Sequence, residues 1–469
     1  MTRSLNHSIS QSRGSALIAV LWLMAVLTVL MYSFLTEMQV EYALAGGYAD
    51  QRKAEQLAWS AIDLACAMVE NETAPLSKLD DPWSHDEIEF FEVPLGEGCF
   101  TLVHPVYDEG SVAMRWGMED EASKININYA PREVLLKLPG VTEEIADSII
   151  DWRDQDSNAG PSGAESSYYE SQTPSYSCKN QPFETIEELL LVRGVTAEIL
   201  YGEDTNLNGR LEPNENDGDQ TAPRDNGDGR LDPGLYAFVT TVSMDTNLTD
   251  EGQPRVNLNT ANDQQLQQAG FTPEEVLAVN MYRLNRLRSS PQQLPFPNTA
   301  FLLDIMNAKR FREVADAVTV LEGEQVPGLI NVNTAPRAVL LALPGITEDI
   351  AVKIMDYRTQ SGADLSNIGW LAEVLQPRDL QQFALFVTTR SHQFRIHAVG
   401  RIGTPYSNLS TPEEEAGARP RPFKRMIAIF DKLAKPRPRL VYWKDATRLG
   451  MPYDPADGPT PTATRVISP

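Results

Sequence analysis

The first 35 residues constrain this chain more than any other segment. A short basic leader that ends in Arg13-Gly14 runs directly into an apolar stretch over residues 15–35. The stretch is long enough to cross a bilayer as a helix, which needs roughly 20 apolar residues. In a secretory signal the apolar core is shorter and the cleavage site follows it, whereas here the natural processing point, Gly14, precedes it. Cleavage there would make Ser15 the first residue of a mature chain that keeps its membrane helix.

Three other interpretations of this segment stay open. Ala43-Leu44-Ala45 has the small-residue pattern of a signal peptidase site, although two glutamates separate it from the apolar run. An uncleaved anchor is the second, and a buried core helix, rarely so uniformly apolar, is the third. Basic residues precede the span and acidic residues follow it. The positive-inside rule therefore predicts a single-pass protein of the bacterial inner membrane, with a cytoplasmic N-terminus and a periplasmic bulk.

The charge of the chain excludes some partners. Acidic residues outnumber basic ones by 65 to 40, which gives a formal net charge of −25. Such a charge repels nucleic acid and favours cations, so we expect no nucleic-acid partner. Three cysteines, Cys66, Cys99 and Cys178, would permit one disulfide in an oxidising compartment, and which two pair stays open. The sequence has no phosphate-binding Walker loop and no nucleophile elbow, so we expect no enzyme.

Strand and helix patterns predict an α+β fold. A stripe of apolar residues at three- and four-residue spacing continues the N-terminal helix beyond Gly46-Gly47, where paired glycines weaken it. Its members are Ala54, Leu57, Ala58, Ala61, Ile62, Ala65, Met68 and Val69. Strand-like runs follow at 89–94, 99–107 and 112–116, and return at 394–399 and 425–430. We therefore expect a long helix packed on a small antiparallel sheet, with a large all-α domain inserted into the sheet.

The insertion contains an internal repeat. Residues 125–141 read ININYAPREVLLKLPGV, and residues 330–346 read INVNTAPRAVLLALPGI. A more degenerate copy begins VNLNTA at residue 256 and reaches a glycine at Gly270. In each copy the asparagines suit a turn into a helix, and the glycine suits the end of that helix before a second one starts. The repeat therefore predicts a series of helix pairs.

These helix pairs resemble helix-hairpin-helix (SAM-like) repeats. Many such repeats bind DNA through backbone amides at the hairpin. Here Gly140 is followed by Glu143-Glu144 and Gly345 by Glu348-Asp349, so carboxylates stand where a phosphate would lie. We expect the repeats to act as packing modules.

Residues 204–215 match the twelve-residue calcium loop pattern. Oxygen-bearing side chains occupy positions 1, 3 and 5, glycine position 6 and glutamate position 12, which suits a hard cation at a sharp turn. The predicted ligands are Asp204, Asn206, Asn208, the Arg210 carbonyl, Glu212 and Glu215. Pro213 argues against a standard exiting helix, so an acidic loop without metal is the alternative. Calcium would be structural here, because it would relieve the repulsion among the carboxylates.

A second segment repeats the acidic pattern less well. Residues 225–232 echo the loop, but Arg224 takes the first ligand position once Gly229 is aligned with the loop glycine. The weaker metal candidates there are Asp225, Asp228 and Asp232.

Taken together, these features resemble the general secretion pathway protein K family, the large minor pseudopilins of type II secretion. Further matching segments lie at 151–156, 163–165, 168–169, 180–183, 188–189 and 192–195. The resemblance implies cleavage after Gly14 by the prepilin peptidase, methylation of Ser15, and assembly with other minor pseudopilins and the inner-membrane platform at the tip of a periplasmic filament. It also implies calcium binding near the acidic loops, which adds Asp154, Asp156 and Glu165 as weaker ligands. Ala19 replaces the usual glutamate at the fifth mature position, which favours a place at the tip.

The resemblance completes the expected organisation. It comprises a prepilin leader (1–14), a transmembrane helix (15–35), a pilin-like helix with first strands (36–120), a first helical repeat domain with the calcium loop (121–250), further repeats (251–390), returning strands (391–435) and a proline-rich tail (436–469). Two alternative functions stay open. One is a membrane-anchored helix-hairpin-helix DNA receptor, and the other is an anchored periplasmic calcium-binding scaffold.

Overall fold

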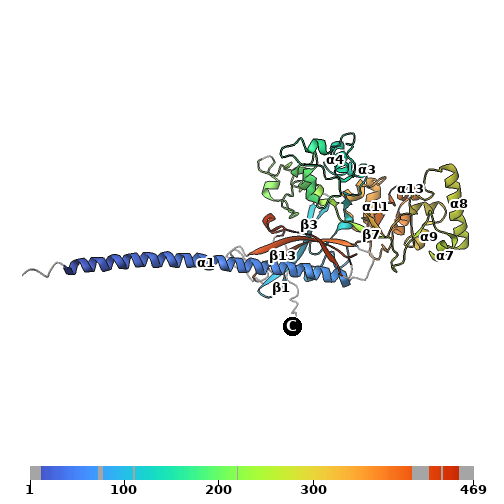
Figure 1. Cartoon of the computed structure of the whole chain (residues 1–469). Helices are drawn as coiled ribbons and strands as arrows, with labels where there is room; N and C mark the ends of the chain where they lie inside the picture. The colour runs from blue at the N-terminus through green and yellow to red at the C-terminus, as the bar shows by residue number, and fades with distance from the viewer. Residues whose placement is uncertain are drawn as a thin grey trace, which may run out of the picture.

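The computed structural model describes residues 12–71, 78–108, 111–218, 220–403, 422–434 and 437–453. A long N-terminal helix leads into a twisted sheet, and a helical region built from several repeats lies beyond the sheet (Figure 1). Most of the predicted leader, residues 1–11, lies outside the described residues.

Helix α1 (Ser12–Asn71) is continuous over 60 residues, including Gly46 and Gly47. Its N-terminal part contains a window of mean hydropathy 2.4 that is 0% buried within the molecule. By length and composition this is the one described helix that could cross a membrane. The predicted apolar helix is therefore confirmed, while its orientation stays a prediction.

The second half of α1 packs on the sheet through the predicted stripe. Ala54, Ala58, Ala61 and Ala65 are fully buried. Small side chains are required there, because a Cβ added to Gly400 in the sheet would clash with the Ala54 carbonyl oxygen. The helix backbone therefore lies almost directly on the strand, and a compact apolar core forms around this contact.

The sheet has seven strands, and all of its pairs are antiparallel. The main order is β1 (Val93–Leu95), β2 (Gly98–Asp108), β13 (Gln393–Ile402), β14 (Phe423–Asp431) and β15 (Arg439–Asp445), with β3 (Ser111–Arg115) on β2 and β4 (Glu119–Asp120) on β13. In the register, Val399 of β13 lies opposite Thr101 of β2. Strands from the two ends of the chain are therefore neighbours, which confirms that the helical region is inserted into the sheet.

Three details of the predicted fold are wrong. The run predicted as a strand from residue 89 begins inside a short helix, α2 (Glu87–Phe90), because the Asp86 carboxylate caps the backbone N–H groups of Ile88 and Glu89. The expected tail contains β15, followed by η8 (Thr447–Leu449), because β14 offers an unpaired edge. The insertion is not purely helical, because short strand pairs close each repeat.

The insertion contains three repeat units, each opened and closed by two-residue strands that pair in parallel. Unit one (125–240) comprises β5 (Ile125–Asn126), α3 (Arg132–Leu135), α4 (Glu143–Arg153), α5 (Ser166–Tyr169), η2 (Ile186–Leu191), α6 (Ala197–Tyr201), η3 (Pro213–Glu215), η4 (Leu235–Ala237) and β6 (Val239–Thr240). Unit two (256–319) comprises β8 (Val256–Asn257), α7 (Asp263–Gln268), α8 (Pro273–Ser289), η5 (Thr299–Asp304), α9 (Ala308–Val314) and β9 (Val318–Thr319). Unit three (330–388) comprises β11 (Ile330–Asn331), α10 (Arg337–Ala342), α11 (Glu348–Arg358), η6 (Ile368–Trp370), α12 (Leu371–Val374), α13 (Pro377–Phe383) and β12 (Val387–Thr388).

The same side chains stabilise all three units. The first asparagine of each unit accepts a backbone N–H two residues on, at 2.8–3.0 Å, from Asn128, Asn259 and Asn333. The second asparagine then donates its amide to a carbonyl late in the unit, on Phe183, Phe296 and Leu365. The hairpin glycines Gly140, Gly270 and Gly345 have positive φ angles of 72°, 92° and 73°. The predicted helix pairs are thus present, while their relation to the helix-hairpin-helix family stays a prediction.

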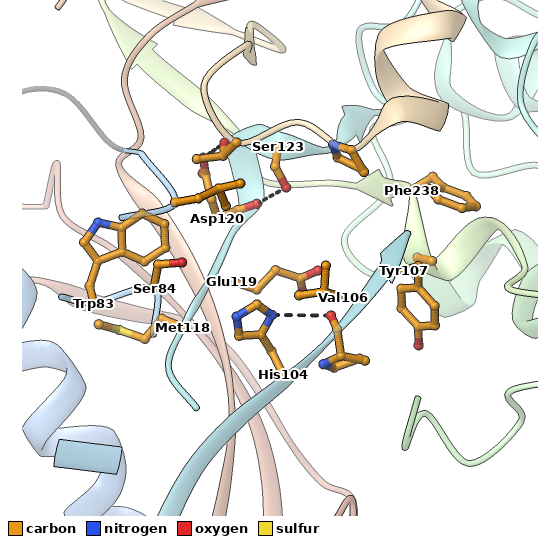
Figure 2. A pocket seen from close by; sticks show the side chains of 15 residues that line it. Trp83, Ser84, His104, Val106, Tyr107, Met118, Glu119, Asp120, Ser123 and Phe238 are labelled. Atoms are coloured by element: carbon orange, nitrogen blue, oxygen red, sulfur yellow. Dashed lines mark hydrogen bonds between the residues drawn. The ribbon is translucent and has the colours of Figure 1, made fainter. Parts of the chain in front are cut away.

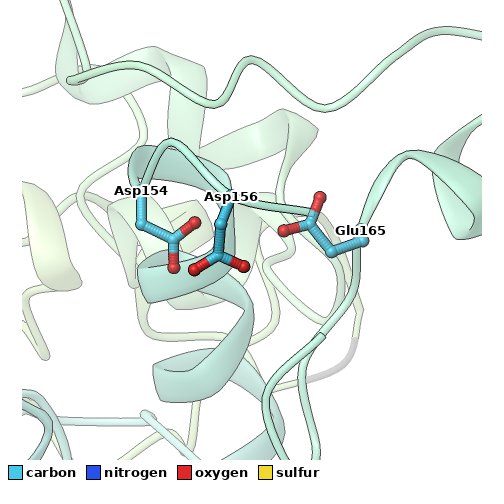
Figure 3. Close-up of side chains that lie close together, drawn as sticks. All are labelled: Asp154, Asp156 and Glu165. Atoms are coloured by element: carbon cyan, nitrogen blue, oxygen red, sulfur yellow. The ribbon is translucent and has the colours of Figure 1, made fainter. Parts of the chain in front are cut away.

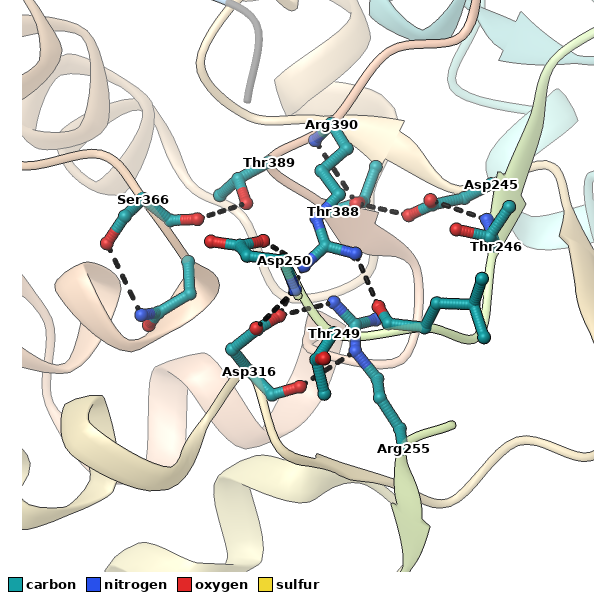
Figure 4. Close-up of polar contacts among 12 residues, drawn as sticks. Asp245, Thr246, Thr249, Asp250, Arg255, Asp316, Ser366, Thr388, Thr389 and Arg390 are labelled. Atoms are coloured by element: carbon teal, nitrogen blue, oxygen red, sulfur yellow. Dashed lines mark hydrogen bonds and ion pairs between the residues drawn. The ribbon is translucent and has the colours of Figure 1, made fainter. Parts of the chain in front are cut away.

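An ion-pair network joins unit two to the end of unit three (Figure 4). Arg390, which follows β12, is 3% exposed and donates to the carboxylates of Asp250 and Asp316. Arg255, just before β8, donates to Asp316 Oδ1 at 2.9 Å. Two further strands pair beside it, β7 (Met244–Thr246) and β10 (Gln325–Pro327). These contacts fix the linkers between the units. No disulfide joins Cys66, Cys99 and Cys178 in the part of the chain that the structure describes.

Candidate functional site

The predicted calcium loop folds on itself between α6 and η3. The Asp204 carboxylate is 1% exposed and accepts the backbone N–H groups of Asn208 and Gly209, both at 2.9 Å. Gly209 has a φ angle of 64°, so a glycine is needed at this position of the turn. The side-chain amides of Asn206 and Asn208 both donate to Glu212 at 3.0 Å. The structure therefore brings these predicted ligands into one cluster.

Glu215 completes the cluster from the last position of the loop. Its Oε2 accepts the Glu212 N–H at 3.0 Å, but its Oε1 is buried and has no hydrogen-bond partner among the described residues. Burial, together with the charges of Asp204 and Glu212, raises the pKa of Glu215 to about 7. A buried carboxylate oxygen without a donor is suited to a cation, so these residues fit calcium. Arg210 donates its backbone N–H to Asn208 Oδ1 at 2.7 Å.

Two residues from the sheet hold this loop, and the sequence analysis did not identify either. Tyr107 at the end of β2 donates its hydroxyl to Asp204 Oδ2 at 2.6 Å. Arg425 of β14 is fully buried and donates to the carbonyls of Asn206, at 3.0 Å, and Leu207, at 2.5 Å. Because 219 positions separate Arg425 from Asn206, no local pattern could have indicated this contact.

The weaker candidates Asp154, Asp156 and Glu165 also come together (Figure 3). One carboxylate oxygen from each lies within 4.8 Å of the others. Asp154 Oδ1 and Glu165 Oε1 are buried without a hydrogen-bond partner among the described residues. Burial raises the pKa of both carboxyls, and neighbouring carboxylates raise it further. This cluster is therefore a second place where the donors fit a hard cation.

The remaining candidates, Asp225, Asp228 and Asp232, form no comparable cluster among the described residues. Asp225 accepts the N–H groups of Gly218 and Gly227, and Asp228 accepts that of Arg230. Asp232 accepts the Asn226 amide. Each carboxylate thus stabilises a turn in its own segment. At the anchor, Gly14 and Ser15 lie in the first turn of α1.

A small pocket lies where the sheet meets the helical insertion (Figure 2). Its walls include Trp83, Met118 and Phe238. His104 is buried there, and burial lowers its pKa to about 4, so its imidazole is neutral near pH 7. Asp120 lies on the other side of the pocket, in contact with unit three. Of these two groups, Asp120 links the sheet to the helical insertion.

Comparison with known proteins shows which family this chain resembles. The family described as "Type II secretion system (T2SS), protein K" matches residues 121–201. Two curated proteins named Type II secretion system protein K, from Aeromonas hydrophila and Pseudomonas aeruginosa, are 27% and 26% identical over 40% and 38% of this chain. These matches confirm the resemblance to the protein K family of type II secretion systems. The aligned regions span only 60% and 57% of the length of those two relatives.

The segment matched by the protein K family covers most of unit one. It includes Asp154, Asp156 and Glu165 and ends before Asp204, the first residue of the loop. Among solved structures, one chain of the GspK-GspI-GspJ complex from the enterotoxigenic Escherichia coli type 2 secretion system is 16% identical to this chain. That alignment covers 87% of this chain and 98% of the solved chain, with a TM-score of 0.40.

Proposed function

We propose that this chain is a minor pseudopilin in the tip complex of a type II secretion pseudopilus. Helix α1 carries the proposal. Its first half is apolar and exposed, and its second half is the central core element of the sheet domain. One rigid rod can therefore lie in a membrane or among the helices of a filament while it carries a folded head. The match of residues 121–201 to the protein K family supports the choice of secretion system.

The anchor defines how the chain enters the filament. The prepilin peptidase cleaves after Gly14, and Ser15 becomes the methylated N-terminus. Ala19 then offers no carboxylate to neutralise the terminal amine of a neighbouring subunit. A subunit without that carboxylate has no electrostatic reason to lie beneath another one, which supports a position at the tip. The partners are other minor pseudopilins and the inner-membrane platform, and the bulk of the chain is periplasmic.

The mass and N-terminal sequence of the protein from membranes of its own host test this proposal. We expect a chain that starts at Ser15 and carries one extra methyl group. Gly14→Val should abolish this processing, while Ala45→Leu, which blocks the alternative signal peptidase site, should leave it intact. A wild-type chain that starts at Met1 would indicate an anchored scaffold. A start at Gly46 would indicate a chain released from the membrane, and either result would contradict the pseudopilin.

Calcium is the proposed structural cofactor. The loop ligands are Asp204, Asn206, Asn208, the Arg210 carbonyl, Glu212 and Glu215. Support comes from the unpartnered Glu215 Oε1 and from the carboxylates crowded around it. The cluster of Asp154, Asp156 and Glu165 would take a second ion on the same grounds. Bound calcium neutralises the repulsion among these groups, and the chain's own role is to hold the oxygens in place through Tyr107 and Arg425.

Thermal unfolding of the full chain in detergent tests the calcium proposal. We expect added calcium, after treatment with a chelator, to raise the unfolding temperature, because a ligand at about 100 times its dissociation constant stabilises by about 2.7 kcal/mol. Glu215→Gln should weaken calcium binding about tenfold or more, since it removes one charge from the ligand set. Asp228→Asn is the matched control and should bind calcium normally. Equal unfolding temperatures with chelator and with calcium would refute the proposal.

The hairpins favour this function over a DNA receptor. Glu143 and Glu348 lie in the first turns of α4 and α11, where a DNA phosphate would have to approach. Each of them pairs with an arginine of its own unit, Arg132 and Arg337. The hairpins thus combine a negative charge with an internal ion pair, which suits packing between repeats and disfavours a polyanion.

A further inference from the structure

Helix α8 presents an unusual exposed face. Leu277, Met281, Leu284 and Leu287 are 61%, 55%, 55% and 45% exposed. Their spacing of three and four residues places them in one stripe along the helix. Leu294, just beyond the helix, is 59% exposed. We name Leu277, Met281, Leu284 and Leu287 the α8 stripe. It is an apolar face on a 17-residue helix that lies far from the free end of α1 (Figure 1).

The internal repeat shows how an equivalent face is covered. Arg153 of α4 and Arg283 of α8 make the same contacts, each donating to two carbonyls of the opening turn of its unit. Aligning them places Asp147, Asp151 and Asp154 opposite Leu277, Met281 and Leu284. In unit one the chain itself covers this face, because Ser162 and Gly160 donate their N–H groups to Asp147 and Asp151. A helix face of this kind therefore packs against an added segment.

Unit two lacks the covering segment. Phe183 and Phe296 make the same bonds to the second asparagine of their units. Phe183 follows Arg153 by 30 positions, but Phe296 follows Arg283 by only 13. The residues at the equivalent positions also differ, because unit one has aspartates there and unit two has leucines and a methionine. An apolar stripe in place of three carboxylates indicates a face that is buried by a different chain.

The charge around the stripe indicates the chemistry of that chain. Arg286 and Arg288 lie in the last turns of α8, in a protein whose net charge is −25. Neither forms a salt bridge with any residue in the described part of the chain. Arg288 lies eleven positions after Leu277, which places it on the same side of the helix as the stripe, whereas Arg286 lies on the opposite side, over the Phe301 ring at 5.7 Å. The basic end of α8 therefore complements an acidic partner.

We propose that the α8 stripe binds a segment of another periplasmic protein that presents apolar side chains bordered by carboxylates. The apolar side chains cover Leu277, Met281 and Leu284, and a carboxylate pairs with Arg288. The inference depends on the exposed face and its charge, and it holds whether or not the N-terminus is processed after Gly14.

Site-specific photo-crosslinking of the full chain in its own host tests the inference. A photoreactive residue replaces Leu277 in one variant and Val352 in the control. Val352 is the equivalent position of α11 when Arg358 is aligned with Arg283, and it is 45% exposed. We expect irradiation at position 277 to give one discrete product, and mass spectrometry to locate the crosslink in a segment of apolar residues next to aspartate or glutamate. Position 352 should give no such product.

Two further variants define the contact. Arg288→Glu should lower the crosslinking yield about tenfold or more, as should Leu284→Glu. Unchanged thermal unfolding shows that the variants fold, and Leu284→Gln replaces Leu284→Glu if the latter does not. Changing the mapped partner carboxylate to lysine should restore the yield in the Arg288→Glu variant.

Several outcomes would overturn the inference. They are no product, equal yields at positions 277 and 352, a yield unaffected by the charge reversal, or a product that contains only lipid or a second copy of this chain. The N-terminal mass of the protein in the same samples reports separately whether the chain is cleaved after Gly14. Failure of the docking site is therefore distinguishable from failure of the pseudopilin proposal.

Discussion

In each repeat unit, one arginine stabilises the turn at the start of the unit. Arg153, Arg283 and Arg358 end or lie within the second helix and reach back to two carbonyls of the opening turn. A guanidinium satisfies both carbonyls at once, because its donors have a fixed fork geometry. The sequence contains this signal, since the arginines follow the first asparagine of their units by 27, 26 and 27 positions, but the residues between them differ too much for the spacing to have been used.

Replacing this arginine should loosen its own unit. In unit three, Arg358 donates to the carbonyls of Ala335 at 2.7 Å and Val332 at 3.1 Å. We expect Arg358→Ala to lower the free energy of unfolding by about 2–4 kcal/mol, because it leaves both carbonyls without their charged donor. Urea unfolding followed by the fluorescence of Trp370, which stacks on Tyr357 in the same unit, measures the change. The exposed Arg378→Ala is the control, and an equal effect of both variants would contradict this account.

A single carboxylate couples the sheet to unit three. Asp120 is 3% exposed and accepts hydrogen bonds from Asn331, Thr334 and Ser391. Burial nevertheless outweighs these bonds and raises its pKa to about 6. Because the folded state binds this proton more tightly than the unfolded state, Asp120 contributes stability at low pH that is lost as the pH rises.

The stability of the protein should therefore depend on Asp120 between pH 4 and pH 6. The shift of its pKa from 3.8 to about 6 corresponds to a loss of about 3 kcal/mol across this range. Asp120→Asn should remove this part of the pH dependence, while the exposed Asp80→Asn should keep it. Urea unfolding at several pH values measures the slope. Identical slopes for wild type and Asp120→Asn would show that this carboxyl keeps an ordinary pKa.

Among the elements, α1 and β13 make the closest contact of the sheet domain. The alanines of α1 and Gly400 of β13 let the two backbones approach, and a Cβ at Gly98 in β2 would meet the Arg401 carbonyl oxygen and the side chain of Leu57. The alanine stripe was visible in the sequence as a helical period. The matching glycines were not, because a glycine in a strand has several explanations until the facing element is known.

Adding one methyl group should separate these elements. A Cβ at Gly400 would meet the backbone of α1 at Ala54 and Ala58. We expect Gly400→Ala to lower the free energy of unfolding by about 1–3 kcal/mol, because neither backbone can move aside. Gly46→Ala is the matched control, since nothing lies within 4 Å of its Cβ and alanine favours a helix. Thermal unfolding in detergent compares them, and a neutral Gly400→Ala would refute this packing.

For the whole molecule, the last strand joins parts that are far apart in the sequence. β15 pairs with β14, and its Lys444 forms an ion pair with Glu187 of unit one. Further on, Tyr453 is 3% exposed and lies against Phe91 and Trp116. The prolines around this segment predict an extended tail. The segment instead forms a strand because β14 offers an edge for pairing, and Tyr453 fits into a cavity beside Phe91 and Trp116.

Two truncations test whether β15 and Tyr453 stabilise the sheet. A chain that ends after Leu433 should unfold at a lower temperature and aggregate, because the edge of β14 becomes exposed and Tyr453 is lost. A chain that ends after Tyr453 should behave as the full protein. Thermal unfolding and size-exclusion chromatography measure both effects. Equal behaviour of the two truncations would show that β15 adds nothing to stability.

The sequence by itself determined the features that depend on neighbouring residues. These are the apolar helix, the hairpin glycines of the units, the asparagine turns and the folded shape of the loop at Asp204. They all arise from contacts within a few positions, so the sequence pattern alone predicts them. Tertiary structure alone decided which distant groups meet: Arg425 and the loop, Gly400 and α1, Asp120 and unit three, and which helix face stays exposed at α8. Those contacts span up to hundreds of residues, and only packing against a specific neighbour selects them.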